Sequence, residues 1–383
     1  MALYNFLLPF AVSLAKVAAS FNPKIAEGFK ERKNLRESWK LGSERLARNG
    51  PLVWFHVSSV GEFEQAKPVM DLLTKRIDPS LEIALTFFSP SGMNYFSKFD
   101  LSEKNPSIRF VDYLPIDTTG NVRFCLDTLR PDLIAYVKFD LWPNLITEAS
   151  RRGIPQILIS GTLAPNSKRL SKVSRNFYGN LYSKLSAIAA ISNEDRDRFM
   201  KYSGGDLDVI TAGDTRFDQV CRRIDTSTTS LPETLLANER SFLIAGSTWP
   251  KDEEIVIPGF KRLIEKLQEI VLILVPHEPT PKRLLEIEQE LKKSNLPFHP
   301  LSSISGSRNF DGKVIVADGV GYLAELYRMG SVAYVGGSFT TGVHNVMEPA
   351  VLGLPVLFGP RIENSYEARR LLELGAAKVV RTP

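Results

Sequence analysis

The chain of 383 residues is longer than one ordinary hydrophobic core requires, so its length predicts two domains of about 150 to 200 residues each. Apolar residues make up 43% and charged residues 24% of the sequence, which excludes a disordered chain and a polytopic membrane protein. The formal net charge of +5 is modest, and no nucleic-acid partner is expected.

Residues 1–22 are predicted to form an apolar membrane-anchor segment. Their apolar stretch is about as long as a marginal transmembrane span, but Pro9 and Lys16 weaken that interpretation. A helix that lies in the membrane surface fits better, and the alternative is an ordinary first helix packed on its domain. Basic residues that suit the anionic headgroups of a cytoplasmic leaflet follow the segment: Lys24, Lys30, Arg32, Lys33, Arg36, Lys40, Arg45 and Arg48.

Residues 23–221 alternate between short apolar runs and segments of helix length. This alternation is typical of βαβ units and predicts a parallel sheet that is covered by helices on both faces. The predicted strands are residues 52–57, 82–87, 108–113, 133–137, 156–160, 188–191 and 209–212.

Residues 222–238 are polar and are predicted to link two domains. The alternation resumes in residues 239–383. The fold class expected is α/β, with two Rossmann-like, doubly wound parallel-sheet domains that face a central cleft. The predicted strands of the second domain are residues 241–245, 271–275, 314–317, 332–335 and 356–358.

The cysteines and histidines give no sign of cross-links or metal sites. Cys125 and Cys221 provide no disulfide framework and favour a reducing compartment. The four histidines are scattered without metal-ligand spacing, so we expect no bound zinc. No cofactor is expected either.

A candidate general base follows the first predicted strand. His56 lies in that strand, and Ser59, Gly61 and Glu62 follow in a glycine-containing turn. A carboxylate at this strand end is well placed to take a proton from an acceptor hydroxyl. The alternative for Glu62 is an acid that the dipole of a helix favours at its N-terminus. His56 is expected to be a buried group with satisfied hydrogen bonds.

A candidate nucleotide site lies near the C-terminus. Gly336, Gly337 and Ser338 follow a predicted strand, and a tight turn there would bring N–H groups close to a phosphate. Glu348 comes where the next helix is expected to begin, within reach of a sugar hydroxyl, and Asn345 lies just before it. For the glycines alone, a plain strand-turn-helix connection is the alternative.

Together the motifs resemble those of the 3-deoxy-D-manno-octulosonic acid (Kdo) transferases of lipopolysaccharide synthesis, which have the GT-B fold. The resemblance implies an inverting, metal-independent transfer of Kdo from CMP-Kdo to a lipid A precursor (lipid IVA), at the cytoplasmic face of the inner membrane. It covers nearly the whole chain through His56 to Glu62, Trp142 to Asn144, Ser192 to Asp195, Gly213 to Asp218, Gly246 to Trp249, Pro276 to Pro279 and Gly336 to Pro349.

The resemblance also implies roles for single residues. Residues 23–221 become the acceptor domain and residues 239–383 the CMP-Kdo domain. Glu62 is implied to be the base, Glu348 to bind the ribose, and Asn345 to brace the same nucleotide. The other donor-side candidates are Pro276, His277, Ser192, Arg216, Ser247, Thr248, Gly336, Gly337 and Ser338.

Several assignments leave an alternative open. Ser192 is equally an N-cap and a ligand, and Arg216 either contacts the donor or forms an ion pair at the domain interface. Asp140, with Ser59 and Gly61, either orients the acceptor or holds its own loop. Many relatives carry arginine where this chain has His277. The donor contact expected at this position would therefore be made by an imidazole instead of a guanidinium.

Two other functions are compatible with the sequence. A nucleotide-sugar 2-epimerase or another GT-B transferase shares the architecture, although an epimerase needs no membrane segment. A nucleotide-binding regulatory module without turnover is the alternative from another class. The presence of both candidate acids argues weakly against that module.

Overall fold

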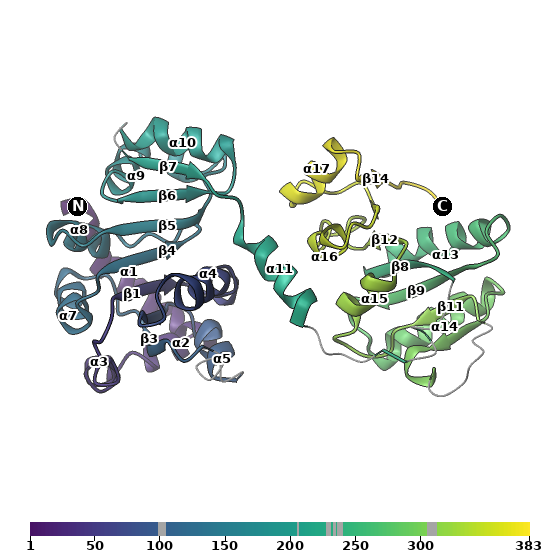
Figure 1. Ribbon diagram of the computed structural model, residues 1–383, viewed down its shortest axis with the longest axis horizontal. Coiled ribbons are helices and arrows are strands. Elements are labelled where there is room, and N and C mark those ends of the chain that lie inside the picture. The colour runs from purple at the N-terminus through teal and green to yellow at the C-terminus, as the bar shows by residue number, and fades with distance from the viewer. Residues whose placement is uncertain (99–104, 205–206, 227–230, 233–234, 236–239, 305–311) are drawn as a thin grey trace. The chain divides into compact units, whose positions relative to one another are not determined.

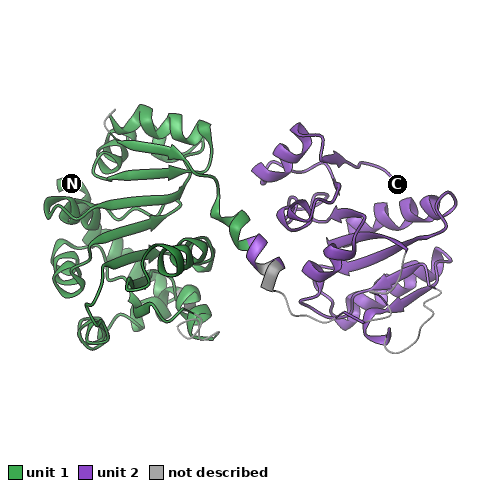
Figure 2. Cartoon of the chain, viewed as in Figure 1, with its two compact units in different colours: residues 1–219 green, residues 220–383 purple. Residues whose placement is uncertain are grey.

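The computed structural model describes residues 1–98, 105–204, 207–226, 231–232, 235, 240–304 and 312–383. The chain divides into two compact units, which are residues 1–219 (unit 1) and residues 220–383 (unit 2) (Figure 2). Each unit contains a sheet that has seven strands in the described residues (Figure 1). The predicted fold class of two Rossmann-like α/β domains is confirmed, and the cleft between them stays a prediction.

The sheet of unit 1 has the strand order β3-β2-β1-β4-β5-β6-β7, with parallel pairing throughout. The strand order reverses between β1 and β4, and in open α/β sheets ligands bind outside the carboxyl ends of the strands at such a point. We call that side of each sheet its carboxyl edge. The strands are β1 (Leu52–Val57), β2 (Glu82–Phe87), β3 (Ile108–Tyr113), β4 (Leu133–Val137), β5 (Gln156–Gly161), β6 (Ala187–Ala190) and β7 (Asp208–Thr211).

Two hydrophobic clusters form the core of unit 1. In one, the rings of Trp39 and Trp54 meet edge to face with centroids 5.7 Å apart. In the other, Phe63 packs against Phe87 at 5.5 Å. The helices of the unit are α1 (Ala2–Ala19), α2 (Pro23–Lys30), α3 (Leu35–Ser43), α4 (Val60–Leu72), α5 (Pro90–Lys98), α7 (Thr119–Leu129), α8 (Pro143–Arg151), α9 (Arg175–Tyr182) and α10 (Asn193–Ser203).

The sheet of unit 2 has the order β10-β11-β9-β8-β12-β13-β14 and is also parallel. Its order reverses between β8 and β12. The strands are β8 (Ser241–Thr248), β9 (Ile270–Pro276), β10 (Phe298–Pro300), β11 (Val314–Val316), β12 (Val332–Val335), β13 (Val356–Phe358) and β14 (Ala377–Val379). The helices are α13 (Pro250–Ile264), α14 (Pro281–Lys293), α15 (Leu323–Met329), α16 (Met347–Val351) and α17 (Tyr366–Glu373).

Helix α11 (Thr215–Thr226) occupies the start of the predicted linker, residues 222–238. The helix continues past residue 221 because Val220 and Ile224 share one face, where they pack with Met347. Residues 227–230, 233–234 and 236–238 of that linker lie outside the described residues.

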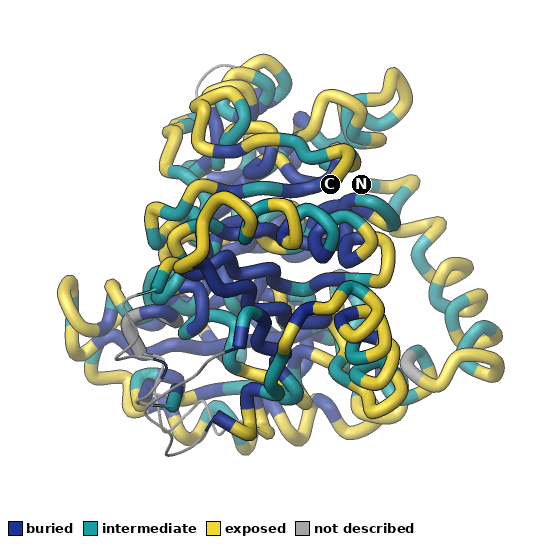
Figure 3. The backbone as a smooth tube through the Cα atoms, turned by 90° about the vertical axis from the view of Figure 1, so that its right-hand side faces the viewer, coloured by how far each residue is buried: buried dark blue, intermediate teal, exposed yellow. Residues whose placement is uncertain are grey.

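Helix α1 rests on unit 1 along one face and is exposed along the other. Tyr4 donates a hydrogen bond of 2.9 Å to Asp117, and Asn144 donates one of 2.7 Å to Asn5. In Figure 3 the helix that starts at the N-terminus shows no buried segment. By length and composition alone, α1 is able to cross a membrane. Its exposed apolar residues recur at helical spacing: Leu3, Phe6, Leu7, Phe10, Leu14 and Val17.

Candidate active site

Glu62 lies in the first turn of α4, directly after β1, at the carboxyl edge of the sheet in unit 1. Ser59, the residue before the helix, donates its hydroxyl to the Glu62 carboxylate. A β-carbon on Gly61 would approach only the Ser59 hydroxyl, at 3.7 Å, so there is open space beside Gly61, whereas the neighbouring Glu62 is largely buried. The position therefore suits both a helix N-terminal acid and a base that a substrate can reach.

Asp140 is a second carboxyl group at this edge, after β4, the neighbour of β1. Its Oδ2 is buried without a hydrogen-bond partner among the described residues and lies 3.6 Å from Nε2 of His56. Burial raises the pKa of Asp140 to about 7, the charge of Glu62 adds to the rise, and Arg169 opposes it. Two acidic groups, one of which retains its proton near neutral pH, suit acid–base chemistry.

His56 is buried in β1, and Trp142 donates its indole N–H to the imidazole Nε2 at 2.7 Å. The other ring nitrogen, Nδ1, lies 3.0 Å from the hydroxyl of Thr86. Burial, together with the smaller effect of the Arg32 charge, lowers the pKa of His56 to about 3. The expectation that His56 is a buried, satisfied group is confirmed.

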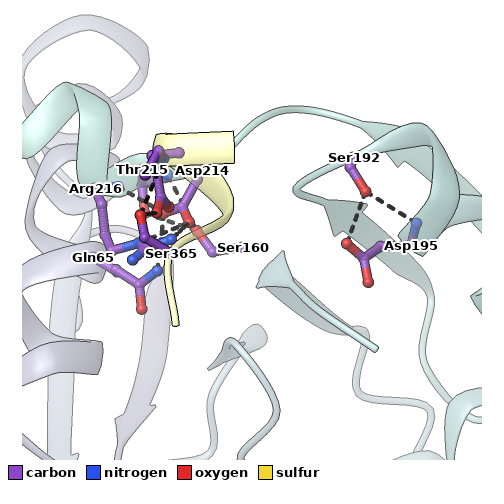
Figure 4. A network of polar contacts seen from close by, with 10 residues as sticks. Gln65, Ser160, Ser192, Asp195, Asp214, Thr215, Arg216 and Ser365 are labelled. Carbon is purple, nitrogen blue, oxygen red and sulfur yellow. Dashed lines mark hydrogen bonds and ion pairs between the residues drawn. The ribbon is translucent and has the colours of Figure 1, made fainter. Parts of the chain in front are cut away.

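Arg216, a donor-side candidate, forms an ion pair of 2.6 Å with Asp214, and both belong to unit 1. Figure 4 shows Gln65 beside this pair, where its amide donates to Asp214 at 3.0 Å. Next to them the hydroxyls of Ser160 and Thr215 lie 2.7 Å apart. Arg216 is therefore one partner of an ion pair inside unit 1, and both an ion pair at the domain interface and a donor contact stay predictions.

Ser192 caps helix α10. Its hydroxyl accepts from the backbone N–H of Asp195 at 3.1 Å and donates to the Asp195 carboxylate at 2.8 Å (Figure 4). The N-cap interpretation is confirmed, and this hydroxyl is committed to the start of the helix.

The glycine turn after β12 makes its hydrogen bonds inside unit 2. Gly336 donates its N–H to Gly246 at 2.9 Å, and Gly337 donates to the buried Asp252 at 2.9 Å. Ser338 is fully buried, and its hydroxyl accepts from the N–H of Gly359 at 2.9 Å. The N–H groups of Gly336 and Gly337 are therefore engaged within unit 2, and the phosphate contact of this turn stays a prediction.

Steric constraints explain why positions 336 and 337 are both occupied by glycine. A β-carbon on Gly336 would lie 2.3 Å from the backbone oxygen of Ser247. Gly337 has a φ of +95°, a conformation that L side chains rarely adopt. The two glycines thus permit a close backbone approach between β12 and β8 and a left-handed turn.

Ser247 and Thr248 end β8 and differ in accessibility. Thr248 is largely buried, donates to Glu253 at 2.9 Å and lines a pocket together with Trp249, so its predicted donor contact stays a prediction. Ser247 has a φ of +53°, and strain of this kind in a residue other than glycine concentrates at functional sites. Ser247 therefore stays a candidate at the carboxyl edge of unit 2.

A stack of rings extends this edge. His277 follows Pro276, the last residue of β9, and its ring stacks on that of His344 with centroids 4.4 Å apart and planes 10° apart. Trp249 lies 5.0 Å from His277 and donates its N–H to Nε2 of His344 at 2.8 Å. Burial lowers the pKa of His344, and His277 lowers it further. The sequence singled out His277 but not its two ring partners.

Glu348 lies in the first turn of α16, and Asn345 donates its amide to the Glu348 carboxylate at 3.3 Å. The side-chain oxygen of Asn345 accepts from the N–H of Met347 at 3.0 Å. Asn345 thus orients Glu348 rather than pointing away from it. The ribose contact of Glu348 stays a prediction.

Residues 28–219, half of the chain, match the family model of the 3-deoxy-D-manno-octulosonic-acid transferases (Kdo transferases). The chain belongs to this family. The Kdo transferase of Chlamydophila psittaci is 28% identical over 351 residues, which are 85% of this chain and 74% of that protein. The Kdo transferase of Haemophilus influenzae is 29% identical over 327 residues, 84% of this chain and 73% of that protein.

One solved structure is similar to this chain, and the similarity concerns the fold only. The UDP-GlcNAc 2-epimerase of Methanocaldococcus jannaschii is similar with a TM-score of 0.58 at 16% identity, over 86% of this chain and 89% of that one. The likeness supports the two-domain architecture. The resemblance to Kdo transferases that the motifs predicted is confirmed by the family match.

Proposed function

We propose that the chain transfers Kdo from CMP-Kdo to the disaccharide of a lipid A precursor, lipid IVA. The observation that carries this proposal is the match of residues 28–219 to the Kdo transferase family. The position of Glu62 at the carboxyl edge of that same region supports it.

The proposed reaction is an inverting displacement. The Glu62 carboxylate accepts the proton of an acceptor hydroxyl as the hydroxyl oxygen attacks the anomeric carbon of Kdo. The bond between that carbon and the phosphate oxygen breaks, and CMP leaves with the electron pair. Positive charge develops on the sugar in the transition state, so the nearby carboxylate also stabilises it.

The donor occupies the carboxyl edge of unit 2 in this proposal. Glu348, oriented by Asn345, accepts hydrogen bonds from the ribose hydroxyls. His277 is exposed at the end of β9 and contacts the cytosine or the phosphate where many relatives use arginine. The stack of His277 on His344 holds the imidazole in place for that contact.

The reaction is proposed to need no metal. Transfer should therefore continue in the presence of EDTA. Loss of transfer with EDTA and recovery with a divalent cation would contradict this part of the proposal.

The protein is proposed to act at the cytoplasmic face of the inner membrane. The exposed apolar face of α1 would enter the headgroup region, and the basic residues that follow would contact anionic lipids. No acidic residue precedes Glu27, so nothing in α1 repels such a surface.

The direct test is incubation of the protein with CMP-Kdo and a tetraacylated lipid A precursor, followed by mass spectrometry of the lipid. The proposal predicts a mass gain of one or more Kdo units with release of CMP. An unchanged lipid, in a preparation that still binds CMP, would contradict it.

A further inference from the structure

Unit 1 contains a pocket of about 420 Å³ that the reaction described above does not use. It is lined by the first turn of α3, by Pro115 and Ile116 after β3, and by Asn121 and Phe124 of α7. We propose that this pocket binds a phosphate group of the lipid acceptor. The inference rests on the proposed function and adds a subsite to it.

Positive charge dominates the lining. Lys33 and Arg36 are exposed, and neither forms an ion pair with any residue that the structure describes. The guanidinium of Arg36 lies 5.1 Å from the centre of the Phe124 ring, which holds it at the pocket wall. Glu37 is the one acidic residue that lines the described pocket.

Arg32 adds a third cation, fixed in place. Its guanidinium donates to the backbone oxygens of Gly28, Phe88 and Leu114 at 2.6 to 2.9 Å. Burial lowers the pKa of Arg32 to about 10, so the side chain stays charged at neutral pH. Its hydrogen bonds go to neutral carbonyl groups, and Asp112 is the carboxyl group whose charge acts on it, so the guanidinium still adds positive potential to the pocket.

The N-terminus of α3 adds backbone hydrogen-bond donors to the pocket. Asn34 precedes the helix, and its side chain makes no capping hydrogen bond. In the first turn the N–H of Glu37 donates to the backbone oxygen of Asn34 at 3.1 Å, and no side chain caps the N–H groups that precede it, beside Lys33 and Arg36. Cations, backbone donors and a hollow of this size together suit a phosphate group.

A line of contacts connects the pocket to the proposed site of reaction. The Arg32 guanidinium lies 4.7 Å from the Phe88 ring, and that ring lies 4.5 Å from Trp142. Trp142 in turn bonds to His56, which is 3.6 Å from Asp140. Phe88, like Glu62, follows a strand of the sheet, so pocket and base share one carboxyl edge.

The pocket also adjoins the apolar segment. Ile116 lines it, and the next residue, Asp117, accepts the hydrogen bond from Tyr4 of α1. A lipid with its phosphate in the pocket would thus have its acyl chains near α1 and its sugar hydroxyl on the edge that carries Glu62. This placement favours the acceptor over a soluble anion as the occupant.

The test compares two acceptors in neutral detergent micelles, which contain no anionic lipid. One is the phosphorylated lipid A precursor, and the other is the same lipid after phosphatase treatment. The variant Lys33→Gln/Arg36→Gln should raise KM for the phosphorylated acceptor about tenfold and leave KM for the dephosphorylated one unchanged. Lys33→Gln alone, which touches no ring, should show a smaller shift in the same direction.

The matched control is Lys75→Gln/Arg76→Gln, which removes two charges from exposed positions of unit 1 outside the pocket. It should change neither KM. Equal KM changes for both acceptors, or none, in the Lys33/Arg36 variant would overturn the proposal. So would loss of binding to phosphatidylglycerol vesicles with phosphate discrimination intact, because the occupant would then be a bilayer lipid. A parent protein that modifies neither acceptor would instead contradict the proposed function.

Discussion

Trp142 donates its indole N–H to Nε2 of His56, and this contact keeps the imidazole proton on Nδ1, which faces Thr86. A neutral imidazole with both nitrogens engaged has no free site for a substrate proton. The carboxyl groups of Glu62 and Asp140 are therefore the groups at this edge that can exchange one. His56 instead has a structural role at this edge, through its contacts with Trp142 and Thr86.

Replacing Trp142 by phenylalanine keeps an aromatic ring and removes the donor. A buried acceptor on His56 is then unpaired, which should lower the free energy of unfolding by about 1 to 3 kcal/mol. Urea denaturation measures the loss. Trp249→Phe is the matched control, because its partner His344 is partly exposed and water can replace the donor. A loss for Trp249→Phe as large as that for Trp142→Phe would contradict the assignment.

The raised pKa of Asp140 predicts a pH dependence of stability. Because the pKa is 3.8 in the unfolded reference and about 7 in the folded protein, the folded state binds more protons between these values. Stability should therefore fall as the pH rises from about 4 to 7. Asp140→Asn should reduce this fall by about 2 kcal/mol, measured by urea denaturation at pH 5 and pH 8.

Asp127→Asn, at an exposed position in the same unit, serves as the control for Asp140→Asn. It should keep the pH dependence of the parent protein. If both variants follow the parent, Asp140 does not retain a proton in the folded state.

Membrane binding should depend on the exposed face of α1. The variant Leu7→Ser/Phe10→Ser/Leu14→Ser removes three exposed apolar side chains and should weaken binding to phosphatidylglycerol vesicles by at least about a hundredfold. Cosedimentation measures this. Three exposed leucines elsewhere provide the control, as Leu267→Ser/Leu285→Ser/Leu374→Ser. Similar losses in both variants would show that α1 is not the anchor.

Glu348→Ala should weaken CMP binding about tenfold, because it removes an acceptor for the ribose hydroxyls. Isothermal titration calorimetry with CMP measures the change. Glu290→Ala, on an exposed face of α14, should bind CMP as the parent does. An unchanged affinity in Glu348→Ala would remove that residue from the nucleotide site.

The sequence predicted the central strands of the sheets well because strands such as β1 and β2 are buried on both faces and therefore read as continuous apolar runs. The predicted strands 52–57 and 82–87 have the observed bounds. The strands β10 and β14 were missed, since each is short and neither forms a continuous apolar run: β10 contains His299 and β14 contains Lys378. The helical conformation of residues 222–226 in the predicted linker was not foreseen, because Ile224 packs on residues distant in sequence.

The candidate site was predicted less completely, for a physical reason that Gly337 illustrates. Its N–H donates to Asp252, a residue 85 positions away, and no local pattern predicts such a partner. The burial of Ser338 and the contact of His344 with Trp249 likewise depend on residues that are distant in the sequence. By contrast, the position of Glu62 in a helix start after β1 follows from local sequence alone.

The rate of Kdo transfer by Glu62→Gln tests the central claim most directly. The substitution keeps the shape of the side chain and removes its basicity, so transfer to the lipid A precursor should fall at least about a hundredfold while CMP binding is retained. A transfer rate within a few-fold of the parent would contradict the role of Glu62 as the base.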